Sequence, residues 1–165
     1  MINNSSYIKI FLVIILAFSN HLYAQEVKVI KAPELYKMLD NCDADLCVYN
    51  FWATWCAPCV REIPHFENLS KSNHDIHVKL ISLDDVDDIY TRVRSFINKR
   101  NIHSEVLLLD EIDFNEIIPM VSDDWSGAIP ATLIVDRSGK KYFYEKEFKE
   151  GELNETIQNL PNYQN

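Results

Sequence analysis

The residues with the clearest potential for chemistry are two cysteines, Cys56 and Cys59, separated by only two residues. They follow an apolar run of strand length and begin a segment with helical periodicity, so we expect Cys56 to lie at the N-terminus of a helix. Unpaired amide groups and the positive end of the helix dipole stabilise a thiolate there. A sulfur on the first helical turn can reach the first cysteine. The pair is therefore expected to cycle between dithiol and disulfide.

Two other uses of this pair are open to a sequence of this kind. A structural zinc site would need a second pair of ligands, which Cys42 and Cys47 or His65 could supply, but the strand-to-helix context is unfavourable to it. An inert structural disulfide is disfavoured because such bridges seldom lie in a Trp-x-x-Trp-Cys-x-Pro-Cys segment at a helix start. We therefore expect redox chemistry and no bound metal.

The elements that position this pair follow from the apolar pattern around it. Leu46 to Trp52 is almost continuously apolar, as in a central strand buried on both faces. His77 to Leu83 is a second strand of this kind. Ala57 to Ser72 between them has apolar residues at helical spacing, with a kink predicted at Pro64. A strand, a helix and a strand in this order predict parallel pairing of the two strands.

The rest of the chain extends the same mixed pattern. The acidic run Asp84 to Asp88 precedes a helical segment and is interpreted as N-terminal capping rather than as a cation site. The other predicted elements are a strand at 27–30, helices at 34–41, 89–100, 114–121 and 152–160, a strand at 104–109, and a β-hairpin formed by 131–136 and 141–144. We expect one α/β domain over residues 25–165.

Two motifs together resemble a known superfamily. They are Phe51-Trp52-Ala53-Thr54-Trp55-Cys56-Ala57-Pro58-Cys59 and Ala128-Ile129-Pro130-Ala131-Thr132. The chain resembles the thioredoxin superfamily from about Val27 to Leu160, and is most similar to its exported TlpA-like and ResA-like thiol-disulfide oxidoreductases. That resemblance implies a thioredoxin-like fold, in which helices flank a central mixed β-sheet and an extra helix and strand are inserted before a cis-proline loop.

The resemblance also implies roles for individual residues. Cys56 would attack a substrate disulfide and Cys59 would resolve the mixed disulfide, with Glu62 as a base for the resolving thiol; an exposed helix acid is the alternative for Glu62. A cis peptide bond is expected before Pro130, which would lie beside the cysteines. The expected substrate-binding residues are Trp55, Ala57, Pro58, Ile129 and Pro130.

The second cysteine pair departs from the usual pattern of the superfamily. Cys42 and Cys47 enclose a short loop at the turn into the predicted central strand, and a structural disulfide between them is feasible in an oxidising compartment. Two unpaired thiols, or a second redox pair, are the alternatives.

The N-terminal segment and the charge bear on where the protein acts. Residues 1–24 contain a single charged side chain, Lys9, and a short apolar core, as in a secretory signal peptide cleaved after Ala24. An uncleaved membrane anchor is the alternative, although the apolar core is shorter than the roughly 20 residues that a spanning helix needs. The mature form is expected to be periplasmic or otherwise extracytoplasmic, without stable membrane insertion. A net charge of −9 argues against nucleic acid as a partner.

The function that the resemblance implies is an exported protein-disulfide reductase, of the kind used in cytochrome c maturation. Its partners would be disulfide-bearing protein substrates and a membrane thiol transporter as electron donor, and no organic cofactor is expected. A peroxidatic role is disfavoured because Ala53 stands where a peroxiredoxin motif would place Thr. The alternatives are an oxidase or isomerase of secreted proteins, or a copper chaperone that binds copper(I) through Cys56 and Cys59.

Overall fold

The computed structural model describes residues 26–161 and residue 163. The predicted signal peptide, residues 1–24, lies outside this range. Among the helices within the range, none is both long enough and apolar enough to cross a bilayer.

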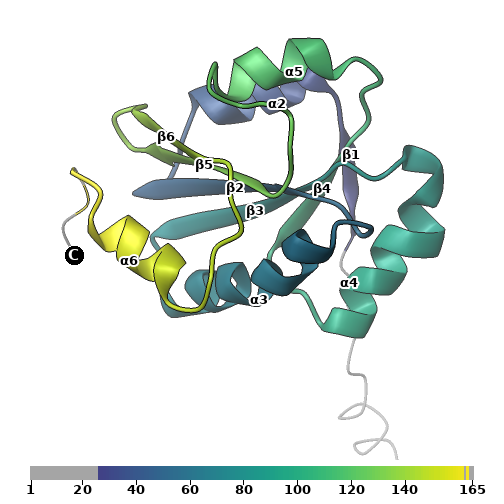
Figure 1. The fold of residues 1–165 in the computed structure, drawn as a ribbon, viewed down its shortest axis with the longest axis horizontal. Coiled ribbons are helices and arrows are strands. Elements are labelled where there is room, and N and C mark those ends of the chain that lie inside the picture. Colours follow the sequence, from purple (N-terminus) through teal and green to yellow (C-terminus); the bar gives the residue numbers. More distant parts are fainter. Residues whose placement is uncertain (1–25, 162, 164–165) are drawn as a thin grey trace, which may run out of the picture.

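A mixed six-stranded sheet forms the centre of the molecule, in the order β1-β4-β3-β2-β5-β6 (Figure 1). The strands are β1 (Lys28–Ile30), β2 (Leu46–Trp52), β3 (Ile76–Ser82), β4 (Glu105–Leu109), β5 (Ala131–Asp136) and β6 (Lys141–Tyr144). The strands β1, β4, β3 and β2 are parallel, whereas β5 pairs antiparallel with β2, and β6 antiparallel with β5. The predicted parallel pairing of the first two long strands and the predicted hairpin are confirmed.

Helices cover both faces of this sheet. The helices are α2 (Ala32–Asp40), α3 (Ala57–Ser72), α4 (Arg94–Arg100), α5 (Phe114–Val121) and α6 (Glu152–Gln158). Figure 1 shows α2 and α5 on one face and α3, α4 and α6 on the other. The chain therefore forms three layers, with two hydrophobic cores separated by the sheet.

Strand β2 explains why its sequence is apolar throughout. All seven residues are buried. The apolar residues at even positions pack in the core beneath α3 and α6, and those at odd positions pack in the core beneath α2 and α5. A strand covered on both faces has no position for a solvated side chain. This strand ends just before the Cys-x-x-Cys segment and fixes where α3 begins.

The expected extra segment lies between β3 and α5. It consists of a 3-10 turn (η1, Val86–Asp88), a π-helical turn (η2, Ile89–Val93), α4 and β4, and β4 is inserted in the sheet between β1 and β3. The single regular helix expected over 89–100 is wrong in its first half, where wider π-type turns replace α-helical ones. Buried Glu67 of α3 anchors the segment by accepting hydrogen bonds from the amides of His103 and Ser104, at 3.0 and 2.8 Å.

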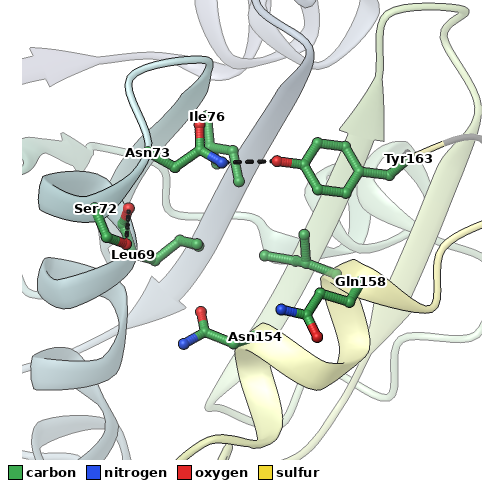
Figure 2. A pocket seen from close by; sticks show the side chains of 8 residues that line it. Leu69, Ser72, Asn73, Ile76, Asn154, Gln158 and Tyr163 are labelled. Carbon is green, nitrogen blue, oxygen red and sulfur yellow. Dashed lines mark hydrogen bonds between the residues drawn. The ribbon is translucent and has the colours of Figure 1, made fainter. Parts of the chain in front are cut away.

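Helix α3 continues through Pro64 over 16 residues. Its far end borders a cavity of about 200 Å³ against α6 (Figure 2). Tyr163 closes this cavity and receives a 2.7 Å hydrogen bond on its hydroxyl oxygen from Asn73 Nδ2. Asn154 and Gln158 of α6 line the opposite side. This cavity lies at the C-terminal end of α3, away from the cysteines at its N-terminus.

Candidate functional site

Cys56 is the N-cap residue of α3, as its sequence context predicts. Its backbone is extended, and the amide of Cys59 donates a hydrogen bond to Cys56 Sγ at 3.3 Å. Pro58 lies in the first turn, where a missing amide hydrogen removes no helical hydrogen bond. A thiolate on Cys56 would therefore be stabilised by the Cys59 amide and by the positive end of the helix dipole.

The structure contains this pair as a disulfide. The Cys56–Cys59 bond has an S–S distance of 1.97 Å and a Cα–Cα distance of 5.3 Å. Cys56 is 5% exposed and Cys59 is completely buried. An incoming substrate therefore meets Cys56 before Cys59.

The cis-proline loop lies opposite Cys56. The Ile129–Pro130 peptide bond is cis, so the sequence expectation is confirmed. The carbonyl oxygen of Ile129 is 3.7 Å from Cys56 Sγ. The loop connects α5 to β5, the neighbour of β2, and in this way two segments more than 70 residues apart meet at the cysteines.

A buried acid outside the predicted site holds the loop before Cys56. Asp84, 3% exposed, accepts hydrogen bonds from Thr54 through both its backbone amide and its hydroxyl, at 2.9 and 2.6 Å, and a third from the Ser82 hydroxyl at 2.8 Å. The interpretation of the whole acidic run as helix capping is therefore wrong for Asp84. It holds for Asp85, whose side chain accepts from the amide of Asp87. Only the tertiary fold reveals that Asp84 faces Thr54.

Glu62 lies one turn after Cys59 and is completely buried, so the alternative of an exposed helix acid is wrong. Its two carboxylate oxygens accept hydrogen bonds from Asn50 Nδ2 and from the amide of Phe148, each at 2.7 Å. Burial raises the pKa of Glu62 to about 7, although these two hydrogen bonds oppose the rise. Its carboxyl group therefore exchanges a proton near neutral pH.

Asn50 connects Glu62 to the strand that follows the cis-proline loop. Its Nδ2 also donates to Thr132 Oγ1, at 3.2 Å, while its Oδ1 has no hydrogen-bond partner within the described part of the chain. Rotation of this amide by half a turn would present Oδ1 to a protonated Glu62. The pair can therefore accommodate either protonation state of the carboxyl group.

An apolar groove of about 190 Å³ lies next to the cis-proline loop. It is lined by Trp55, Leu83, Phe114, Ile118, Trp125, Gly127 and Ile129. Trp55 is 63% exposed, an unusual exposure for so large an apolar side chain. Trp125 is 4% exposed and donates from Nε1 to the Ala128 carbonyl at 2.8 Å, so it serves both core and groove. The contributions of Phe114 and Ile118 were not evident from the sequence, since nothing local places α5 beside this loop.

The second cysteine pair lies at the other end of β2. Cys42 and Cys47 form a disulfide with a Cα–Cα distance of 5.6 Å, which closes the loop between α2 and β2. β2 separates this disulfide from the Cys56–Cys59 pair, because Cys47 is its second residue and Cys56 follows its last residue by four positions.

Three features together define a thioredoxin-like protein. They are a mixed sheet with this strand order, a Cys-x-x-Cys disulfide at a helix N-terminus, and a cis-proline opposite that disulfide. Comparison with known families agrees, since residues 27–140 match the AhpC/TSA family. The chain belongs to that family.

Individual relatives and solved structures point in the same direction. Over 91 residues the chain is 31% identical to a protein named thiol-disulfide oxidoreductase ResA from Bacillus thuringiensis, covering 55% of this chain and 49% of the relative. A thioredoxin-related protein from Neisseria meningitidis superposes with a TM-score of 0.59 at 21% identity, covering 69% of this chain and 83% of that structure. A secreted disulfide oxidoreductase of Mycobacterium tuberculosis, described as homologous to Escherichia coli DsbE, gives a TM-score of 0.55 at 22% identity, covering 70% and 82%.

The matches cover only part of the curated relatives. The chain spans about half the length of the curated relatives it matches. At these identities the solved structures show the shared fold, and the match to residues 27–140 shows the family.

Proposed function

We propose that this protein is a thiol-disulfide oxidoreductase that acts on protein disulfides through Cys56 and Cys59. The observation that carries the proposal is the Cys56–Cys59 disulfide at the N-terminus of α3, with the Cys59 amide directed at Cys56 Sγ and the Ile129 carbonyl facing it. The names of the relatives support the same activity.

The reaction proceeds by two thiol-disulfide exchanges. The Cys56 thiolate attacks one sulfur of a substrate disulfide, forming a mixed disulfide and releasing the other substrate sulfur as a thiolate. The Cys59 thiolate then attacks Cys56 Sγ, which forms the Cys56–Cys59 disulfide and releases the second substrate thiolate. Two electrons pass from the protein to the substrate, and a dithiol must reduce the protein before the next cycle.

Glu62 is proposed to take the proton that the Cys59 thiol must lose before it attacks. It lies one helical turn from Cys59 in the same buried region, and its pKa of about 7 suits a group that both accepts and releases a proton near neutral pH. Arg61, the neighbouring residue, is exposed and forms an ion pair with Glu147 at 2.8 Å, so its charge is directed at Glu147 and not at Glu62.

The substrate is proposed to lie along Trp55, Ala57, Pro58 and the Ile129–Pro130 loop, with an apolar side chain in the neighbouring groove. Exposure of Trp55 and the apolar lining both favour a polypeptide that presents a hydrophobic side chain near its disulfide. Small disulfides without such a side chain would gain nothing from the groove.

More specifically, we propose that the protein is an exported reductase of the cytochrome c maturation type, which receives electrons from a membrane thiol transporter. The apolar segment at residues 10–18, followed by Ala24, supports export with cleavage after Ala24. A second cysteine pair in disulfide form also suits an oxidising compartment.

The reduction potential of the full chain tests this assignment. The chain is equilibrated in glutathione and dithiothreitol buffers, and the redox state of Cys56 and Cys59 is read by alkylation and peptide mass, so that Cys42 and Cys47 are scored separately. Insulin reduction is measured in parallel, with Cys56→Ser as the inactive control.

A potential near or below roughly −270 mV, the value of thioredoxin, together with insulin reduction that Cys56→Ser abolishes, is the expected result. A potential near roughly −120 mV, the value of a strong oxidant, would move the protein to disulfide formation. Retention of one copper(I) ion by the reduced pair without insulin reduction would instead identify a metal chaperone.

A further inference from the structure

A group of potential metal ligands meets at the start of β2, apart from the redox disulfide. Cys47 and His77 are register partners on the parallel strands β2 and β3, so their side chains project from the same face of the sheet. Asp43, in the loop before β2, lies over them, with its Oδ1 3.0 Å from His77 Nδ1. One ligand atom from each of Asp43, Cys47 and His77 lies within 4.8 Å of the others.

Cys42 is the nearest further ligand to this group. Its sulfur is bonded to that of Cys47, so it lies next to the sulfur that Cys47 contributes. The group is open to solvent on one side, because the side chains of His77 and Asp43 are 45% and 80% exposed, while Cys47 is buried. An ion could therefore enter from the side of His77 and Asp43 and reach the sulfurs.

We propose that reduction of the Cys42–Cys47 disulfide converts this group into a binding site for a divalent cation of the zinc type, with Cys42, Cys47, His77 and Asp43 as its four ligands. Two thiolates, one imidazole and one carboxylate make up a ligand set that zinc accepts in tetrahedral geometry. Calcium and magnesium prefer oxygen ligands and would not favour it.

The chemistry balances with a dithiol as the reductant. The dithiol transfers two electrons and two protons to the Cys42–Cys47 disulfide, becomes a disulfide itself, and leaves two cysteine thiols. Zinc binding then displaces one proton from each thiol to solvent and forms two Zn–S bonds. While the disulfide is intact no thiolate is present, so the oxidised protein is not expected to bind the ion.

The surrounding charge suits an occupied site. With two thiolates, one carboxylate and a divalent ion, the occupied site as a whole would carry one net negative charge. Lys79, two residues beyond His77 on β3, interacts electrostatically with Asp43 and also pairs with Glu105. Its ammonium group can therefore balance this charge at the rim of the site.

Cobalt(II) binding to the full chain carrying Cys56→Ser and Cys59→Ser tests the proposal, because only Cys42 and Cys47 then remain. The protein is reduced with dithiothreitol, freed of it without oxygen, and titrated with Co²⁺. One Co²⁺ per chain is expected, with thiolate-to-cobalt charge-transfer absorption that Zn²⁺ abolishes and that the oxidised protein lacks. His77→Ala should weaken the affinity by more than about tenfold, since even the loss of groups that only orient ligands has effects of that size. His74→Ala is the matched control, an exposed histidine outside the group.

A reduced protein without thiolate-to-cobalt absorption, or equal affinities for His77→Ala and His74→Ala, would overturn the proposal. Protection from alkylation provides a second measurement that leaves Cys56 and Cys59 in place. In the reduced full chain, Zn²⁺ should slow alkylation of Cys42 and Cys47, read from their own peptides, and His77→Ala should abolish that protection. Alkylation at the same rate with and without Zn²⁺ would equally overturn it.

Discussion

The buried carboxyl group of Glu62 should make the oxidised protein less stable as the pH rises from about 4.5 to about 7, and Glu62→Gln should remove that loss. Below about pH 4.5 the group is protonated in both the folded and the unfolded chain and has no effect. Between 4.5 and about 7 the folded protein keeps a proton that the unfolded chain has released, so the free energy of unfolding falls. Above about 7 both states are ionised and the loss is complete.

The size of the effect follows from the same two values. A pKa raised from 4.5 to about 7, at about 1.4 kcal/mol for each pKa unit, corresponds to about 3 kcal/mol. Glutamine has nearly the same shape and does not ionise. Its amide can donate to Asn50 Oδ1 once the Asn50 side chain rotates, while its oxygen accepts from the Phe148 amide. The variant should therefore fold.

Urea unfolding of the oxidised full chain at pH 5 and pH 8 measures the difference, because Cys56 and Cys59 do not titrate as a disulfide. Between these pH values the wild type should lose about 2 to 3 kcal/mol more than Glu62→Gln. Glu116→Gln, which changes an exposed acid of α5, is the control and should follow the wild type. The same pH dependence in wild type and Glu62→Gln would refute the assigned ionisation of Glu62.

Three further predictions concern the surroundings of the Cys56–Cys59 pair. Gly127→Ala should lower the free energy of unfolding in urea more than Gly139→Ala does. Each variant loses about 1–2 kcal/mol because it places a side chain at positive φ, but at Gly127 the new Cβ would also lie 3.0 Å from Ile118 Cδ1, whereas at Gly139 it would meet no atom within 4 Å. Equal losses in the two variants would contradict this contact. Asp84→Ala should lower the free energy of unfolding by about 2–4 kcal/mol because it leaves three donors unpaired. Asp85→Ala, which removes a helix cap, should lower it by about 1 kcal/mol. Comparable losses in the two variants would count against the role of Asp84 in holding Thr54. Ile118→Asp should raise KM for insulin about tenfold, since a charge in the groove opposes an apolar side chain, and leave the reduction of glutathione disulfide unchanged; a parallel fall in both activities would argue against the groove.

The parts of the fold that the sequence predicts are those with strong local signals. The apolar run Leu46 to Trp52, the α3 stripe and the hairpin around Gly139 each determine their own structure, and their bounds agree with the fold within a residue or so. The π-helical turn that begins at Ile89 is different, because nothing in the local sequence distinguishes it from an α-helical turn, although Val93 and Ile97 pack in the core as a helical pattern predicts.

The same distinction applies to the site. The cysteines and Pro130 belong to contiguous motifs and could be identified from the sequence. The burial of Glu62 could not, because Phe148 closes over it from a segment 86 residues away. The helix cap predicted at Asp84 is wrong for a similar reason: an acid before a helix resembles a cap until the fold brings Thr54, 30 residues earlier, beside it.

The insertion of β4 between β1 and β3 also constrains the order in which the chain can fold. Within the described part of the chain, strand β1 pairs with β4 alone. The segment after β1 is held by Glu111, whose carboxylate accepts a hydrogen bond from the Ala32 amide 79 residues earlier. Because the chain is synthesised from its N-terminus, β1 is made well before β4, and its backbone can pair in the sheet only once β4 is available. If the protein is exported, residues 28–30 therefore reach the far side of the membrane early and join the sheet only after residues 31–109, about half of the chain, have followed.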